Sequence, residues 1–138
     1  PRRSPALRTG GGVEYVGSIM PVESIPDAYR AGLLIAARND VTYSMGARVV
    51  GRGHAVMFYY AFPFNRADDE DLRKVRLALA ESNVAALDLG GIPWKAEVAG
   101  QQMILERMEP ATYALMQLLR KTLDPHGIMN PGNWEVTP

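Results

Sequence analysis

Strand-like and helix-like patterns alternate along the first third of the chain. Residues 13–20 are rich in β-branched and aromatic residues and stop at Pro21, which predicts a first strand. Apolar positions at helical spacing then follow Ser24 and Pro26 as far as Asn39, which predicts a helix with Ser24 as its N-cap. The chain therefore begins with a strand and a helix.

The next two strand-like runs, residues 41–50 and 54–62, flank Gly51-Arg52-Gly53, where glycine supplies the positive φ of a tight turn. They predict an antiparallel hairpin. The second run is apolar on both of its alternating faces, which is typical of a central strand covered on each side. Tyr59 and Tyr60 fall on opposite faces of it, so one should join the core and the other should face the other side.

The middle of the chain predicts a strand end and a charged helix. Pro63 is expected to end the central strand, and a helix from Glu70 to about Leu87 should follow, capped by Asp68 or Asp69. Two outward i,i+4 ion pairs are expected on it, and its inward stripe should include four apolar residues. The pairs are Asp69 with Arg73 and Glu70 with Lys74, and the stripe is Leu72, Val75, Leu79 and Ala86.

Gly90-Gly91 should end this helix. Residues 92–98 predict a short extended stretch, residues 101–108 a short helix, and Pro110 the start of another helix that ends before Asp124. The buried side of that last helix is expected to consist of Leu115, Met116, Leu118, Leu119 and Leu123. The order of elements predicts an α+β fold, an antiparallel sheet with helices packed on one face in a ferredoxin-like arrangement.

Composition excludes several kinds of site and partner. The 138 residues carry 15 Lys and Arg against 15 Asp and Glu, so a net charge of zero gives no attraction for nucleic acid. The chain has no cysteine and two histidines, so we expect neither disulfides nor a metal site. Its longest apolar run is too short to cross a bilayer, and we expect a cytoplasmic protein without a membrane partner.

The first residues differ in character from the rest of the chain. Residues 1–12 are basic and glycine-rich without a hydrophobic period, so we expect an irregular, flexible segment there and one folded domain over residues 13–138. Because Pro1 is not a start residue, the chain is expected to be a piece of a longer protein.

The most specific string in the sequence is Asp124-Pro125-His126-Gly127-Ile128-Met129-Asn130-Pro131-Gly132. Its glycines permit unusual dihedral angles, its prolines stiffen the chain, and Asp124 can accept backbone donors at the end of a helix, so it predicts a rigid loop. The string also resembles the closing motif of the FAD-linked oxidases, the family of vanillyl-alcohol oxidase and p-cresol methylhydroxylase. Upstream, the acidic-capped helix over residues 67–89, the Gly90-Gly91 pair, the short strand and the paired helices after it also resemble the C-terminal domain of that family.

The resemblance implies a cap domain whose sheet covers the flavin ring and forms the substrate pocket, while a separate FAD-binding domain of the same protein, absent from this chain, holds most of the FAD. The protein would then pass a hydride from a small molecule, either aromatic and para-alkylphenol-like or hydroxylated, to flavin N5. This chain alone would be inactive. A cytochrome or another subunit as electron acceptor and a homo-oligomeric state are further expectations.

The branches of the family differ at two places. The hydroxy-acid dehydrogenases carry Gly-Asp-Gly-Asn-x-His and Gly-Glu-His-Gly strings, whereas this chain has Gly51-Arg52-Gly53-His54 and a late strand without histidine. The phenol-oxidising branch carries a Tyr-Arg pair where Trp94-Lys95 stands here. The resemblance thus makes Trp94 and Lys95 catalytic candidates. Arg48 is a third, since an inward arginine needs an anionic substrate or flavin group as partner, although an arginine that faces outward is the simpler interpretation. On spacing alone, Trp94 would be a core aromatic and Lys95 a solvated lysine.

The resemblance also suggests residues that contact the cofactor. His54 and Tyr60 on the central strand and Asn130 in the terminal loop are the candidates, and His54, Tyr15 and Tyr43 are the residue types that form covalent flavin links in some members. The alternative, without the resemblance, is a stand-alone ferredoxin-like module that binds a small molecule or forms oligomers without catalysis.

Overall fold

The computed structural model describes residues 11–135, which form two compact units that divide between Lys95 and Ala96. The first unit contains β1 (Gly11–Pro21), the short 3-10 helix η2 (Val22–Ser24), α1 (Ile25–Asn39), β2 (Ser44–Val50), β3 (Ala55–Asn65), α2 (Asp69–Asp88) and β4 (Ile92–Pro93). The second unit contains α3 (Val98–Arg107) and α4 (Pro110–Leu123), followed by a loop to residue 135.

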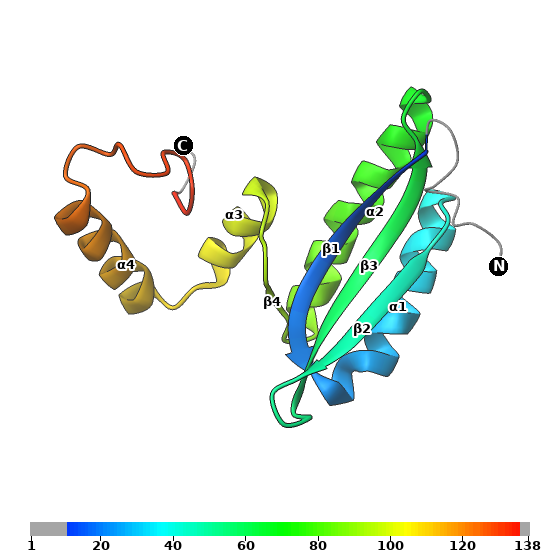
Figure 1. Ribbon diagram of the computed structural model, residues 1–138, viewed down its shortest axis with the longest axis horizontal. Helices are drawn as coiled ribbons and strands as arrows, with labels where there is room; N and C mark the ends of the chain where they lie inside the picture. The colour runs from blue at the N-terminus through cyan, green and yellow to red at the C-terminus, as the bar shows by residue number, and fades with distance from the viewer. Residues whose placement is uncertain (1–10, 136–138) are drawn as a thin grey trace. The chain divides into compact units, whose positions relative to one another are not determined.

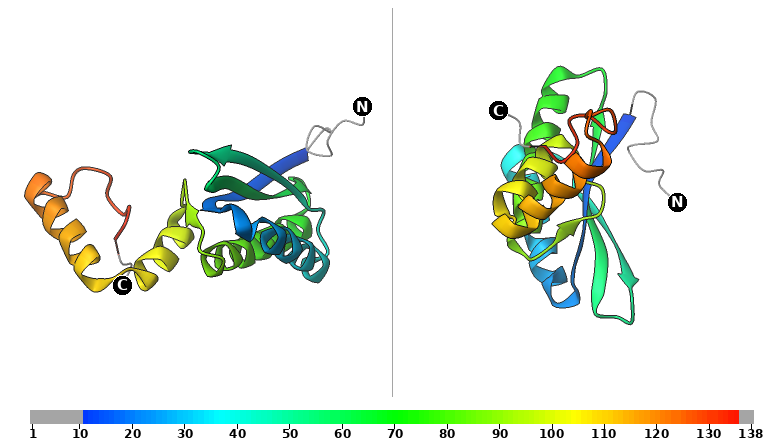
Figure 2. Two further views of the ribbon diagram at one scale, coloured as in Figure 1. Left: turned by 90° about the horizontal axis from the view of Figure 1, so that it is seen from below. Right: turned by 90° about the vertical axis from the view of Figure 1, so that its left-hand side faces the viewer.

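The strands form one antiparallel sheet in the order β2-β3-β1-β4 (Figure 1). With the element order βαββαβ, this is the ferredoxin-like arrangement. Both helices of the unit lie on one side of the sheet, as the left view of Figure 2 shows. The predicted α+β fold is therefore confirmed.

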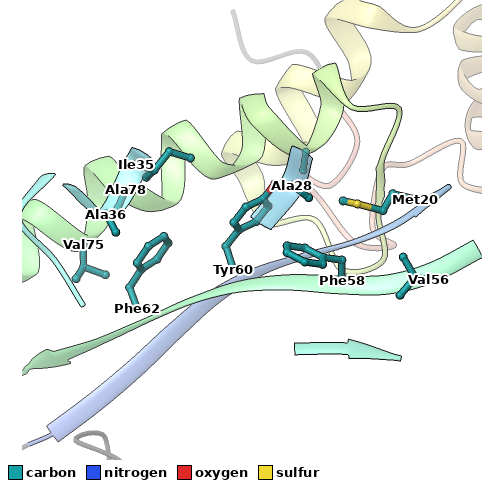
Figure 3. Packing of buried hydrophobic residues seen from close by; sticks show 11 residues of the cluster. Met20, Ala28, Ile35, Ala36, Val56, Phe58, Tyr60, Phe62, Val75 and Ala78 are labelled. Atoms are coloured by element: carbon teal, nitrogen blue, oxygen red, sulfur yellow. The ribbon is translucent and has the colours of Figure 1, made fainter. Parts of the chain in front are cut away.

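The core fills the space between β3 and the two helices. Phe58, Tyr60 and Phe62 project from β3 toward α1 and α2 and are fully buried (Figure 3). Around them lie Met20, Ala28, Ile35, Ala36, Val56, Val75 and Ala78. Burying an aromatic side chain in this way contributes about 2 to 3 kcal/mol, so this layer is the main source of stability for the unit.

The predicted hairpin is confirmed. Its last pair is Val50 with Ala55, and Gly51 and Gly53 have φ values of 61° and 89° in the turn between them. The turn fixes the register of the whole hairpin, because each step away from it pairs the next two residues.

The helix ends depart from the expectation at one place and confirm it at another. Ser24 has helical dihedral angles and no capping bond, and its hydroxyl donates to the Leu89 carbonyl 3.1 Å away. Asp68 does cap α2, accepting from the backbone N–H groups of Glu70 and Asp71. At the other end of α2, Gly90 has a φ of 77°, and the backbone N–H groups of the Gly90-Gly91 pair bond back to the carbonyls of the last turn, a Schellman motif.

Several strand boundaries differ from the prediction. β2 begins at Ser44 and not at Val41, and β3 begins at Ala55 and not at His54. β1 begins at Gly11, so Gly11 and Gly12 belong to a strand and not to a flexible segment; residues 1–10 of that prediction lie outside the described residues. β3 continues through Pro63, because β2 starts opposite Ala61 and the rest of β3 is paired on one side only, where a strand tolerates proline.

The charged face of α2 also differs from the prediction. Arg73 pairs with Glu70 one turn back, and Lys74 reaches Asp40 at the end of α1, each at 2.7 Å. These two pairs replace the expected i,i+4 pairs. They lie on the surface, where ion pairs contribute little to stability.

The second unit differs most from the expectation. Its loop is tied to α3 and α4, but α4 has no buried residue; of the five side chains expected to be buried there, four are exposed and Met116 is half-buried. Leu115, Leu118, Leu119 and Leu123 have exposed fractions of 52 to 76%. Of the predicted extended stretch over residues 92–98, only β4 (Ile92–Pro93) forms a strand. The helix expected to start at Gln101 begins three residues earlier, at Val98.

Candidate functional site

The sheet of the first unit has one face without a helix from that unit. Side chains of odd-numbered residues of β1 and β3 project there, away from α1 and α2. Val13, Tyr15, Ile19, Tyr59 and Ile92 are exposed on this open face, at 36 to 69%. A run of large apolar and aromatic side chains on one exposed face is typical of a surface that another molecule or domain covers.

One row of four residues crosses the open face from strand to strand. Gly46 of β2 pairs with Tyr59 of β3, Tyr59 pairs with Gly17 of β1, and the Trp94 backbone N–H donates to the Gly17 carbonyl at 3.3 Å. Glycine and aromatic residues therefore alternate along the row. The Tyr59 ring lies over Gly46 and the Trp94 indole lies over Gly17, because each occupies the space that a Cβ of the glycine would take.

The rings border a hollow of about 470 Å³. Tyr15 also faces it, with its ring centroid 5.8 Å from that of Tyr59 and a tilt of 59° between the planes. The lining residues are Tyr15, Gly46, Ala47, Arg48, Met57, Tyr59 and Trp94. A concave, mostly apolar surface with few polar groups is the usual form of a site for a small organic ligand.

Arg48 is the one charged residue among those that line the hollow. It lies two residues along β2 from Gly46 and is paired with Met57. Its side chain is exposed, and it makes no hydrogen bond or ion pair within residues 11–135. Its guanidinium is therefore available to an anionic group that enters the hollow, and it can bind such a group with two parallel hydrogen bonds.

The structure separates the Trp94-Lys95 pair. Trp94 lines the hollow, whereas Lys95 is exposed at the end of the first unit and is not a lining residue. The cation and the aromatic rings that share the hollow come from different strands, Arg48 from β2 and Tyr59 from β3. A catalytic role for Lys95 stays a prediction.

The predicted cofactor residues lie in three places. Tyr60 is fully buried on the helix side of β3, away from the open face, whereas Tyr59 lies on the open face; as predicted, the two tyrosines face opposite sides. His54 lies exposed in the hairpin turn. Asn130 lies in the terminal loop of the second unit, with a φ of 48°. Tyr15 lines the hollow, whereas Tyr43 packs in the core against Tyr60.

Two buried tyrosine hydroxyls in the core have no partner. Those of Tyr43 and Tyr60 make no hydrogen bond to any described residue. Burial raises the pKa of Tyr60 to about 12 and that of Tyr43 further above its usual range, because the apolar surroundings disfavour the phenolate. Both hydroxyls therefore stay neutral at physiological pH and carry no acid-base chemistry.

The terminal loop is held by hydrogen bonds to Asp124 and Arg120. The Asp124 carboxylate accepts from the backbone N–H groups of Ile128 at 2.9 Å and Met129 at 2.7 Å, and these two bonds lower its pKa. Arg120 donates to the carbonyls of Asn130 and Asn133. A second hollow of about 380 Å³ lies beside this loop, but the polar groups of Asp124 and Arg120 are already bonded within the unit.

Between residues 11 and 135, no group of three His, Asp or Glu side chains is placed to hold a metal ion. No helix in the same range is long and apolar enough to span a bilayer.

Comparison with known proteins identifies the family. The model of the FAD linked oxidases, C-terminal domain, matches residues 2–134, nearly the whole chain. The chain belongs to this family. The resemblance drawn from the Asp124–Gly132 string is therefore confirmed.

Two solved structures of larger proteins contain a part with the fold of this chain. One is 4-ethylphenol oxidase from Gulosibacter chungangensis in complex with isoeugenol, with a TM-score of 0.78 and 16% identity over 94% of this chain. Another is alkyldihydroxyacetonephosphate synthase, with a TM-score of 0.56 and 14% identity over 91% of this chain. This FAD-linked oxidase domain spans 25% of the first protein and 21% of the second.

The most informative residues of the domain's open face were not selected from the sequence. Gly17 and Gly46 were not considered, and Tyr59 was an undecided alternative. From the sequence, the turn Gly51-Arg52-Gly53 would pair Val50 with His54, and counting back from it would have placed Gly46 opposite Phe58. In the structure the turn also includes His54, so Val50 pairs with Ala55 and Gly46 with Tyr59. Gly17 and Trp94 join the row through pairings between distant segments, for which the sequence gives no local signal.

Proposed function

We propose that this domain is the substrate-side cap of an FAD-dependent oxidoreductase, with the substrate bound in the hollow on the open face of the sheet. FAD, when bound, supplies the acceptor for a hydride taken from the substrate. The observation that carries the proposal is the aromatic hollow with one unpaired arginine at its edge.

The open face fits a flat ring. Tyr59 and Trp94 lie along the sheet and not upright on it, because Gly46 and Gly17 leave room beneath them. A planar ligand can stack on such rings with an energy of about 0.5 to 1.5 kcal/mol per pair beyond its area burial. The described residues include no glycine-rich loop between a strand and a helix N-terminus, so the phosphates of FAD would be held by another domain of the same protein.

Arg48 gives the hollow a preference for anions. When a ring covers the open face and excludes water, the attraction between a guanidinium and an oxyanion increases, since the local dielectric constant falls. Arg48 would then favour the deprotonated, negatively charged form of a substrate hydroxyl. This form gives up a hydride more readily than the neutral one, because the electron pair of the oxygen replaces the pair that leaves with the hydride. Para-alkylphenols and other hydroxylated aromatic molecules can ionise in this way.

The similar structure supports phenols as the first probes. It is that of a 4-ethylphenol oxidase with isoeugenol, and its fold matches this domain. In our proposal Trp94 and Tyr59 position the aromatic ring, Arg48 binds the oxygen, and Lys95 is a second cation to be tested beside it.

The test uses the full-length protein that contains this domain. We expect it to bind FAD and to show flavin reduction by 4-ethylphenol in anaerobic stopped-flow measurements. Arg48→Met should lower the reduction rate about 10- to 100-fold, because the phenolate from which the hydride leaves loses one charge-assisted interaction and is less populated. The matched control is Arg52→Met, which removes an exposed arginine in the neighbouring turn that does not line the hollow.

Two results would count against the proposal. A folded full-length protein that takes up no FAD would favour the alternative, a ferredoxin-like binding module without catalysis. Equal reduction rates in Arg48→Met and Arg52→Met would remove Arg48 from the site. Lys95→Met, measured in the same series, decides whether the second cation takes part.

A further inference from the structure

The two glycines beneath the aromatic rings are not required by the backbone. Gly17 and Gly46 lie within regular strands, and neither has a positive φ. Glycine in a strand costs about 0.5 to 1 kcal/mol relative to alanine, since it loses more conformational freedom on folding. Glycine at these two positions therefore lowers the stability of the sheet. What favours glycine there must be the space above the backbone, which a side chain would fill.

A side chain at either position would collide with a ring. A Cβ at Gly46 would lie 2.2 Å from Cζ and from Oη of Tyr59, and a Cβ at Gly17 would lie 2.3 Å from Cζ2 of Trp94. Real Cβ atoms do not approach other atoms this closely, so the ring would have to move. The backbone of the sheet lies beneath each ring, and the space left to it is the hollow.

We propose that Gly17 and Gly46 determine which ligands the hollow admits. By letting Trp94 and Tyr59 lie flat, they keep the hollow deep enough for an aromatic ligand with a substituent. A larger residue at either position lifts the ring into the hollow and excludes thick ligands more strongly than flat ones. The inference rests on the proposed function, because it assumes that the ligand binds on the open face.

A purely structural role makes a different prediction. An aromatic ring that covers a strand glycine also stabilises a sheet, whether or not a ligand binds. In that case Gly46→Ala would change the free energy of unfolding but not the ligand preference. If Gly46 acts through the position of the Tyr59 ring, its effect on binding must disappear once that ring is removed.

The experiment titrates the FAD-loaded full-length protein with two phenols and follows the flavin absorption spectrum. We would use 4-chlorophenol as the flat probe and 4-tert-butylphenol as the thick probe, since neither has a hydrogen on a carbon attached to the ring that could be transferred. For Gly46→Ala we expect Kd to rise roughly 5- to 10-fold for 4-chlorophenol, the loss of one stacking interaction. Kd for 4-tert-butylphenol should rise more than that.

A double variant tests whether Gly46→Ala changes ligand binding through the position of the Tyr59 ring. In a Tyr59→Ala background, adding Gly46→Ala should change Kd less than twofold, and Gly17→Ala should behave likewise in a Trp94→Ala background. A crystal structure of Gly46→Ala should show the Tyr59 ring raised from the sheet. Gly12→Ala is the matched control, because its Cβ would lie 2.7 Å from Cζ of Phe64 in the same sheet but outside the hollow. It should leave both Kd values unchanged.

The inference is overturned if Gly46→Ala binds both phenols as the wild type does, if the two Kd values rise equally, or if the effects of Gly46→Ala and Tyr59→Ala add. Failure of the proposed function looks different. In that case the protein lacks FAD, or Arg48→Met leaves phenol binding intact, whatever the glycine variants do.

Discussion

The two units of this chain are built on different amounts of buried surface. The sheet unit buries three aromatic residues of β3 beneath two helices, whereas α4 of the terminal unit buries none of its 14 residues. Both were expected to bury an apolar stripe, because both have apolar residues at regular spacing. The comparison shows that an amphipathic pattern predicts a face that can be buried, but it does not tell whether the same unit supplies the cover.

The terminal unit relies on polar bonds in place of a core. Arg120 and Asp124 hold the loop through backbone groups, and Gln101 of α3 accepts from the Trp134 backbone N–H at 2.8 Å. Such bonds contribute about 1 kcal/mol each in net terms, less than a buried aromatic residue. The sheet unit should therefore dominate the stability of the chain.

The largest expected difference comes from core truncation. Phe58→Ala should lower the free energy of unfolding by about 3 to 5 kcal/mol, since it removes a fully buried ring and leaves a cavity. Leu119→Ala on α4 should change it by less than about 0.5 kcal/mol, because that side chain is already exposed. Urea unfolding of the 138-residue chain, followed by circular dichroism, measures both. Equal losses would contradict the comparison.

Two glycines with positive φ, one in each unit, allow a matched test of how much each unit contributes to stability. Gly90 at the end of α2 and Gly132 in the terminal loop have φ values of 77° and 80°, and both have open space where a Cβ would lie. Alanine should cost about 1 to 2 kcal/mol of local strain at each. Gly90→Ala should lower the main unfolding transition by that amount, whereas Gly132→Ala should leave the transition of the sheet unit unchanged. A shift of the sheet transition in Gly132→Ala would show that the units unfold together.

One substitution inside the core is expected to raise the free energy of unfolding, by less than the core truncation lowers it. Tyr60→Phe removes a buried hydroxyl without a partner and should stabilise the sheet unit by about 1 kcal/mol. Tyr59→Phe, on the open face of the same strand, should leave stability unchanged. Thermal unfolding of both variants provides the measurement. A loss of stability in Tyr60→Phe would reveal that its hydroxyl has a partner, such as an ordered water.

The sheet could be predicted closely because its signals are local. The Gly51-Arg52-Gly53 turn set the hairpin, Asp68 marked the start of α2 and Gly90 its end, and all three were confirmed. Errors arose where the cause is tertiary. Pro63 was expected to end β3, but pairing on one side only, which depends on where β2 begins, makes proline tolerable there.

The candidate site could be predicted only in part. Arg48 and Trp94 were selected from the sequence and both line the hollow, but Lys95 does not: it lies in the bend after β4, where no regular spacing predicts the direction of a side chain. Tyr60 was chosen over Tyr59, although the alternation of the strand left the choice between them open. Which face of β3 meets the helices depends on how the whole sheet packs, and no local pattern records it.

The most local effect is a pH dependence of the terminal loop. The folded-state pKa of Asp124 is lowered by its bonds to the N–H groups of Ile128 and Met129, so its contribution is complete above its ordinary pKa, near 4, and is lost as the pH falls through the lowered value. Hydrogen-exchange protection of the Ile128 and Met129 amides should therefore decrease in acid. The Asp124 amide is the internal control, because it donates to the backbone carbonyl of Arg120, which does not titrate. Asp124→Asn should weaken the two amides at neutral pH and remove their pH dependence. Protection that stays constant down to pH 2 would show that the loop is held by Arg120 and Gln101 and not by the carboxylate.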